Sequence, residues 1–167
     1  MAGEGAAVIR RVAVGFACAA ALGCASAYQR TYDQTYEQLE AKADAERKAE
    51  EAAHAEAQKY ASVVYFATGS AVIEQQGYDD IAWFVRQMQP YPKAIIEVRG
   101  FTDSTGSEAK NQALSDQRAD AVAKALEMQG IDASRIKKLG YASNFQAATN
   151  TTTQGRRDNR RVEITVQ

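Results

Sequence analysis

The pattern of hydrophobic positions in the second half of the chain predicts four β-strands. The segments are short and either apolar or alternating, and they cover residues 63–66, 94–100, 136–141 and 161–166. In the last segment Val162, Ile164 and Val166 alternate with polar residues, which is the period of a strand with one buried face. We therefore expect one sheet built from these four strands.

Two helices are predicted between the first three strands. The first carries an apolar stripe at three- and four-residue spacing and is stopped by Pro90 and Pro92, with Trp83 expected beside the stripe in the core. The stripe consists of Ile73, Gly77, Ile81, Phe84, Val85 and Met88. The second helix is predicted over residues 107–128, and Gly130 supplies the left-handed position that commonly ends a helix.

The remaining segment of this region, residues 142–158, is polar and is predicted to be a long loop. The order of elements is then βαβαββ, an α+β fold. We expect a two-layer sandwich with one mixed sheet and both helices on one face, preceded by an extended helix.

The extended helix is predicted from residues 33–60, which are rich in Ala, Glu, Lys and Gln and contain neither Gly nor Pro. Apolar residues recur there at four- and three-residue steps, but Glu46 and Glu50 interrupt the seam that a coiled coil would need. Two interpretations stay open: a solvated spacer, or a helix that self-associates or packs on an envelope partner protein. His54, the single histidine, is expected on the surface of this helix.

The first 27 residues have the pattern of a secretory leader. Arg10 and Arg11 precede an uncharged stretch over residues 12–27, which is shorter than the roughly 20 residues of a membrane-spanning helix. Leu22-Gly23-Cys24 resembles the lipobox of bacterial lipoproteins, although Ala21 and Leu22 depart from its usual order. We expect lipidation at Cys24, the alternative being that Cys18 and Cys24 are small apolar residues of the leader. The chain thus divides into a leader (1–27), a helical spacer (28–60) and a folded domain (61–167).

Charge and chemistry exclude several classes of function. Residues 33–60 carry eight acids and four bases, net −4, and residues 61–167 carry twelve acids and thirteen bases, net +1, so nucleic acid is not an expected partner. The domain lacks His and Cys, and no metal-ligand cluster or phosphate loop is present, so no cofactor or metal is expected. An enzyme would need a second acid beside Asp103, for which Glu108 and Asp116 are the candidates. We expect a protein that is not an enzyme.

The candidate site is a pair of opposite charges. Asp103 follows the carboxyl end of the strand 94–100, where open sheets of alternating strands and helices bind ligands, and Arg118 lies on the apolar face of the next helix. An inward-facing arginine needs an acidic partner or a ligand. The alternative is that the two residues merely form a salt bridge. Gly100 and Gly106 are expected to serve the turn between the two elements.

Four motifs of the domain together resemble the OmpA-like peptidoglycan-binding family of Gram-negative bacteria. They are the turn 66–71, the Gly and Thr-Asp around residues 100–103, the Asn, Leu-Ser and Arg-Ala spaced over 111–119, and the Asn-Arg-Arg tail at 159–161. The resemblance implies that Asp103 and Arg118 hold the diaminopimelate residue of the stem peptide without breaking bonds. It also implies supporting roles for Thr102 and Asn111 and a place for Arg160 near the pocket.

Chemistry supports this reading, because diaminopimelate offers ammonium and carboxylate groups on one short chain and a site with both signs can satisfy them. The resemblance implies an outer-membrane lipoprotein facing the periplasm, and Ala25 after Cys24 fits the sorting pattern. An envelope adaptor or stator-type protein is the alternative, although residues 12–27 contain no acid of the kind that stators use. Two departures from the family are Phe101 in place of histidine and Ala142 in place of glycine.

Overall fold

The computed structural model describes the backbone of residues 24–167 and the side chains of residues 28–167. The lipidation predicted on the Cys24 side chain and most of the predicted leader therefore lie outside the described part of the chain. Residues 49–167 form one compact unit, and the described residues before them belong to another. In chain order the elements are α2 (Cys24–Ala57), β1 (Ala61–Tyr65), α3 (Gln75–Met88), β2 (Ile96–Gly100), α4 (Glu108–Met128), a 3₁₀ turn (Ala133–Arg135), β3 (Ile136–Gly140), α5 (Thr153–Asn159) and β4 (Arg161–Val166).

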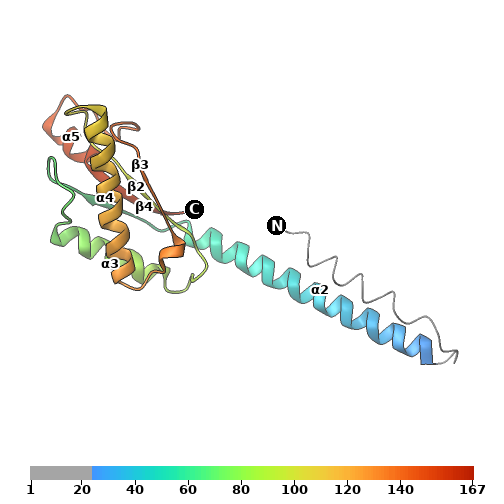
Figure 1. The fold of residues 1–167 in the computed structure, drawn as a ribbon. Coiled ribbons are helices and arrows are strands. Elements are labelled where there is room, and N and C mark those ends of the chain that lie inside the picture. Colours follow the sequence, from blue (N-terminus) through green and yellow to red (C-terminus); the bar gives the residue numbers. More distant parts are fainter. Residues whose placement is uncertain (1–23) are drawn as a thin grey trace. The chain divides into compact units, whose positions relative to one another are not determined.

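The four strands form one mixed sheet in the order β1-β4-β2-β3. Strand β4 pairs antiparallel with both β1 and β2, whereas β2 and β3 run parallel. Helices α3 and α4 pack on the same face of this sheet (Figure 1), where their apolar stripes bury the inward-facing residues of β2 and β4. The predicted two-layer α+β fold is therefore confirmed. Because β4 runs antiparallel to its neighbours, the C-terminal ends of β1, β2 and β3 lie beside the N-terminal end of β4. Below, 'edge' means this side of the sheet, where the strand ends meet.

The last turns of α2 belong to the compact unit. Ala57 is completely buried in the core, and the Tyr60 ring lies 6.3 Å from Trp83 and 6.2 Å from Tyr91 between centroids. Trp83 was predicted as a core residue, but 42% of it is exposed, because it lies at the edge of the core, where its ring meets Tyr60. Among residues 24–167, no helix combines the length and the apolar character needed to cross a bilayer.

The region predicted as a loop over residues 142–158 contains helix α5, so that prediction was wrong. The helix is seven residues long and polar, and thus lacks the apolar periodicity that announces a longer helix. Its start is fixed by the Thr152 hydroxyl, which accepts a hydrogen bond from the Gly155 amide at 3.0 Å.

Close packing of α4 on the sheet explains Gly100. A Cβ atom at this position would lie 2.2 Å from the Ser115 carbonyl oxygen, so a side chain here would push the helix away. Gly100 was predicted to serve turn geometry, and the structure corrects this to the close approach of helix and strand. Gly106 has a φ of 98°, which confirms its predicted role in the turn before α4.

Candidate functional site

Asp103 lies at the sheet edge where the strand ends meet, three residues after β2 ends. Its Oδ1 accepts a hydrogen bond from the Thr105 amide at 3.0 Å, and its Oδ2 accepts one from Arg160 Nη1 at 3.0 Å. The side chains of Asp103 and Arg160 are 8% and 13% exposed. Burial alone would raise the pKa of Asp103, but the hydrogen bonds from Thr105 and Arg160 outweigh it and hold the pKa below its usual value. Asp103 is therefore an ionised carboxylate at neutral pH.

Arg160 contributes the positive charge at this edge. Its Nε donates to the Phe66 carbonyl at 3.1 Å, which ties the start of β4 to the end of β1. Its Nη1 donates the hydrogen bond to Asp103 Oδ2, and its Nη2 makes no hydrogen bond within the described part of the chain. A guanidinium fixed on one side with a donor left over on the other can receive an acidic group of a ligand.

Arg118 points inward from α4 and is fully buried, as its position on the apolar face predicts. Its expected partner was an acid or a ligand, but the guanidinium donates to three backbone carbonyls instead. Nε reaches Ser70 at 2.8 Å, Nη1 reaches Phe101 at 2.9 Å and Nη2 reaches Ala67 at 3.0 Å. Burial, then repulsion by Arg160, lower the pKa of Arg118 to about 10, while Asp103 raises it. Arg118 thus remains charged at neutral pH and joins the β1–α3 loop to the end of β2.

Asn111 and Thr102 lie next to Asp103. The Asn111 amide donates to the Asp103 carbonyl at 3.3 Å and so fixes the main chain from α4. The Thr102 amide donates to the Ala142 carbonyl at 2.7 Å, whereas the buried Thr102 hydroxyl has no hydrogen-bond partner. All five residues of the predicted site are therefore at this edge, and the ion pair among them joins Asp103 to Arg160.

Two asparagines complete the edge and were missed by sequence reasoning as site residues. Asn159 is fully buried, and its Oδ1 accepts from the amides of Ala147 and Ala148 while its Nδ2 donates to Asn150 Oδ1 at 3.0 Å. Asn150 Oδ1 in turn accepts from the Ser104 amide at 3.2 Å. This chain of bonds holds the turn that carries Asp103. The available signal was Asn159 in the Asn-Arg-Arg tail, but its partners lie in the region predicted as a loop.

The acids that a hydrolase would need do not join this site. Glu108 and Asp116 are both exposed, and Asp116 accepts hydrogen bonds from the Gln112 side chain on its own helix. Within residues 24–167, no group of three or more potential ligands could hold a metal ion.

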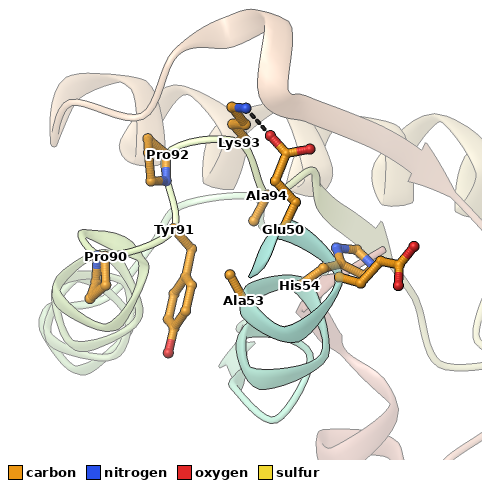
Figure 2. A pocket seen from close by; sticks show the side chains of 9 residues that line it. Glu50, Ala53, His54, Pro90, Tyr91, Pro92, Lys93 and Ala94 are labelled. Atoms are coloured by element: carbon orange, nitrogen blue, oxygen red, sulfur yellow. Dashed lines mark hydrogen bonds and ion pairs between the residues drawn. The ribbon is translucent and has the colours of Figure 1, made fainter. Parts of the chain in front are cut away.

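A larger hollow of about 420 Å³ lies elsewhere, between the last turns of α2 and the turn over residues 90–94. Figure 2 shows Tyr91 along one side of it and the ion pair between Lys93 and Glu50 at its rim. His54 also lines it and is exposed, as predicted. None of the predicted site residues lines this hollow.

Comparison with known proteins places this fold among cell-envelope proteins. Residues 65–160 match the model of the OmpA family. The probable lipoprotein YiaD of Escherichia coli K12 is 44% identical over 103 residues, covering 62% of this chain and 47% of that protein. The peptidoglycan-binding protein ArfA of Mycobacterium tuberculosis H37Rv is 36% identical over 103 residues, covering 62% of this chain and 32% of that protein.

A solved structure shows the same fold. The peptidoglycan-associated lipoprotein from Burkholderia pseudomallei matches with a TM-score of 0.61 at 24% identity, covering 64% of this chain and 90% of that chain. The matched segment spans less than half the length of both curated relatives.

Proposed function

The chain belongs to the OmpA family, and on that premise we propose that it is a non-catalytic lipoprotein that binds the diaminopimelate-containing stem peptide of peptidoglycan. The family is one of peptidoglycan-binding domains without catalytic activity, and a relative carries peptidoglycan binding in its name. The predicted family resemblance is thereby confirmed. The ligand, the residues that grip it and the tethering role are the proposal.

One observation carries the proposal: Asp103 and Arg160 both keep unused bonding capacity. A carboxylate has about four lone-pair sites, and the donors to Asp103 are the amide and side chain of Thr105 and the Arg160 guanidinium, which leaves capacity for a further donor. Arg160 Nη2 has no hydrogen bond within the described part of the chain. A ligand ammonium can therefore bind Asp103 while a ligand carboxylate binds Arg160, which matches the two signs carried by diaminopimelate.

Arg118 supports the same ligand from behind. It has five N–H donors, of which three serve the carbonyls of the surrounding loops. Because Arg118 is fully buried, it acts on the ligand through its positive charge, which favours a carboxylate bound beside Arg160. Thr102 has a buried hydroxyl without a hydrogen-bond partner, and Asn111 keeps the Asp103 main chain in place.

The rest of the chain provides the tether. A lipid on Cys24 anchors the protein in the outer membrane, facing the periplasm, and α2 begins at that residue. Its 34 residues give a helix of about 50 Å, which acts as a spacer between membrane and wall. Several acyl chains on one cysteine make such anchoring stable.

A second role is favoured by the first turns of α2. Tyr28, Tyr32, Tyr36 and Leu39 are exposed, and the Tyr32 and Tyr36 rings stack with centroids 6.5 Å apart. Exposed aromatic residues of this kind are enriched at protein interfaces. The spacer would then dock on an envelope protein, which the wall-binding domain positions. Photo-crosslinking from Tyr28 and Leu39 in living cells would capture that partner; a variant carrying the probe at exposed Glu40 on the same helix is the control.

Binding to the wall is tested by sedimentation of the full chain with purified sacculi. Asp103→Asn and Arg160→Gln should each lower retention at least about tenfold, because each removes one charge-assisted contact. Asp79→Asn, an exposed acid on α3, should behave as the unchanged protein. Equal retention of the unchanged protein and all three variants would contradict the proposed site. Intact mass of the membrane-extracted protein tests the lipid at Cys24 separately.

A further inference from the structure

The sheet has a second recess, on the face that α3 and α4 leave uncovered. It encloses about 290 Å³ and is lined by Arg99, Phe101, Tyr141, Phe145, Arg161 and Glu163. On β2 and β4 its charged residues alternate with the buried residues that face the helices. Asp103 does not line it, so this recess is separate from the wall-binding site.

One carboxylate bridges two arginines in the recess. Glu163 Oε1 accepts from Arg161 Nε at 2.8 Å, and Glu163 Oε2 lies 3.1 Å from Arg99 Nη2. The lining therefore carries two positive charges and one negative charge. Glu97 does not line the recess, but it forms a second, longer ion pair with Arg99, with 3.9 Å between Oε2 and Nε.

Donors on both arginines remain unused. Arg161 is 6% exposed, and its buried Nη1 has no hydrogen-bond partner. The buried Nε of Arg99 has none either, because Glu97 Oε2 lies 3.9 Å away, beyond hydrogen-bond distance. A buried donor on a charged group is costly to leave without an acceptor. Two such donors at one recess indicate that an acceptor belongs there.

Aromatic rings form the other wall. The Arg161 guanidinium lies over the Phe101 ring, 4.1 Å from its centroid. Tyr141 stacks on Phe101 at 5.5 Å, and Phe145 meets Tyr141 edge-on at the rim, 72% exposed. Such a wall suits a flat or apolar body.

We propose that this recess is a second binding site, for a small monocarboxylate with a planar or apolar body. The carboxylate binds the unused donors of Arg161 and Arg99 as a planar two-pronged acceptor, and the body lies against Phe145 and Tyr141. The same chemistry is offered by a free aromatic acid and by the carboxyl terminus of a peptide. The inference is independent of wall binding and holds whether or not Asp103 grips diaminopimelate.

The test uses ligand-observed ¹⁹F NMR of 4-fluorobenzoate with the full chain in detergent micelles. Binding should broaden the fluorobenzoate signal, while 4-fluorobenzamide, a neutral molecule of the same shape, should stay sharp. Arg99→Gln should weaken binding at least about tenfold through loss of a charge-assisted contact. Phe145→Ala, a change at an exposed rim residue, should weaken it several-fold.

Glu163→Gln gives the sharpest result. Removing the internal counter-charge leaves Arg161 without an acidic partner and Arg99 with only the longer contact to Glu97, so fluorobenzoate should bind several-fold more tightly. Asp103→Asn should leave fluorobenzoate binding unchanged, which separates this site from the wall-binding site. Competition by a short peptide with a free carboxyl terminus, but not by its amide, would identify peptide ends as the source. Equal broadening of acid and amide, or unchanged binding in Arg99→Gln, would overturn the proposal.

Discussion

Asp103 and Arg160 form an ion pair with 3.0 Å between Oδ2 and Nη1, although 57 positions separate them along the chain. The strand order explains their meeting. Strand β4 runs antiparallel to β2 and is its direct neighbour, so the residue before β4 faces the residues that follow β2. The pair therefore places an acid, and a guanidinium whose Nη2 makes no hydrogen bond within the described residues, at one edge.

The pH dependence of wall binding follows from Asp103. Its pKa in the folded protein lies below the usual value of 3.8, so the carboxylate stays charged throughout the neutral range. Sacculus binding should be flat across the neutral range and should fall only at a pH below the ordinary value of 3.8, as the carboxylate protonates. Retention of the protein on sacculi, measured from pH 8 down to the acidic range, checks this pH dependence.

The same shift affects stability. Because the folded pKa is depressed, the stabilisation by Asp103 is fully present above the unfolded value and is lost as pH falls through the folded value. The urea midpoint of Asp103→Asn should therefore fall less steeply below pH 4 than that of the unchanged protein.

For wall binding, a midpoint of sacculus retention near pH 6 would contradict the assignment to Asp103, because its carboxylate is already ionised at that pH.

Arg118 and Arg160 should separate structural from binding contributions. Lysine at 118 cannot reach three carbonyls on two segments, so Arg118→Lys should lose about 3 kcal/mol of unfolding free energy. Urea denaturation monitored by Trp83 fluorescence measures this loss. Arg160→Lys should lose about 1 kcal/mol yet still bind sacculi poorly, because lysine lacks the two-pronged donor. Equal stability losses in the two variants would contradict this division.

How far the sequence predicts this molecule depends on how local each feature is. Alternation along residues 161–166 predicts β4 with its observed bounds, and the carboxyl end of β2 correctly places Asp103. The partners of Arg118 are main-chain carbonyls, which carry no residue-specific signal. The pairing of Asp103 with Arg160 requires the order of strands in the sheet, and no short-range pattern contains it.

Asn159 should be a positioning residue for the Asp103 turn. Asn159→Ala leaves the part-buried amides of Ala147 and Ala148 and the Ala148 carbonyl without this partner, so it should lower the unfolding free energy by about 3 kcal/mol in a urea titration. Asn150→Ala removes the acceptor of the Ser104 amide and should be milder, about 1 kcal/mol. At a temperature where both variants remain folded, sacculus binding should still be weakened. Wild-type binding by a folded Asn150→Ala protein would show that the network is structural alone.

Ala142 stands where the family usually has glycine, and its φ of 50° shows why. The left-handed conformation costs an L-residue roughly 1–2 kcal/mol, and glycine avoids this at the expense of a more flexible unfolded chain. The local backbone is fixed on both sides, since the Ala142 amide donates to Ser115 Oγ at 3.1 Å and its carbonyl accepts from Thr102. Ala142→Gly should thus stabilise the protein by about 0.5 kcal/mol, raising the urea midpoint without changing the slope. Ala147→Gly, at a position without positive φ, is the control and should destabilise the protein by about 0.5 kcal/mol. A lower urea midpoint for Ala142→Gly would show that the buried methyl group of Ala142 outweighs the backbone strain.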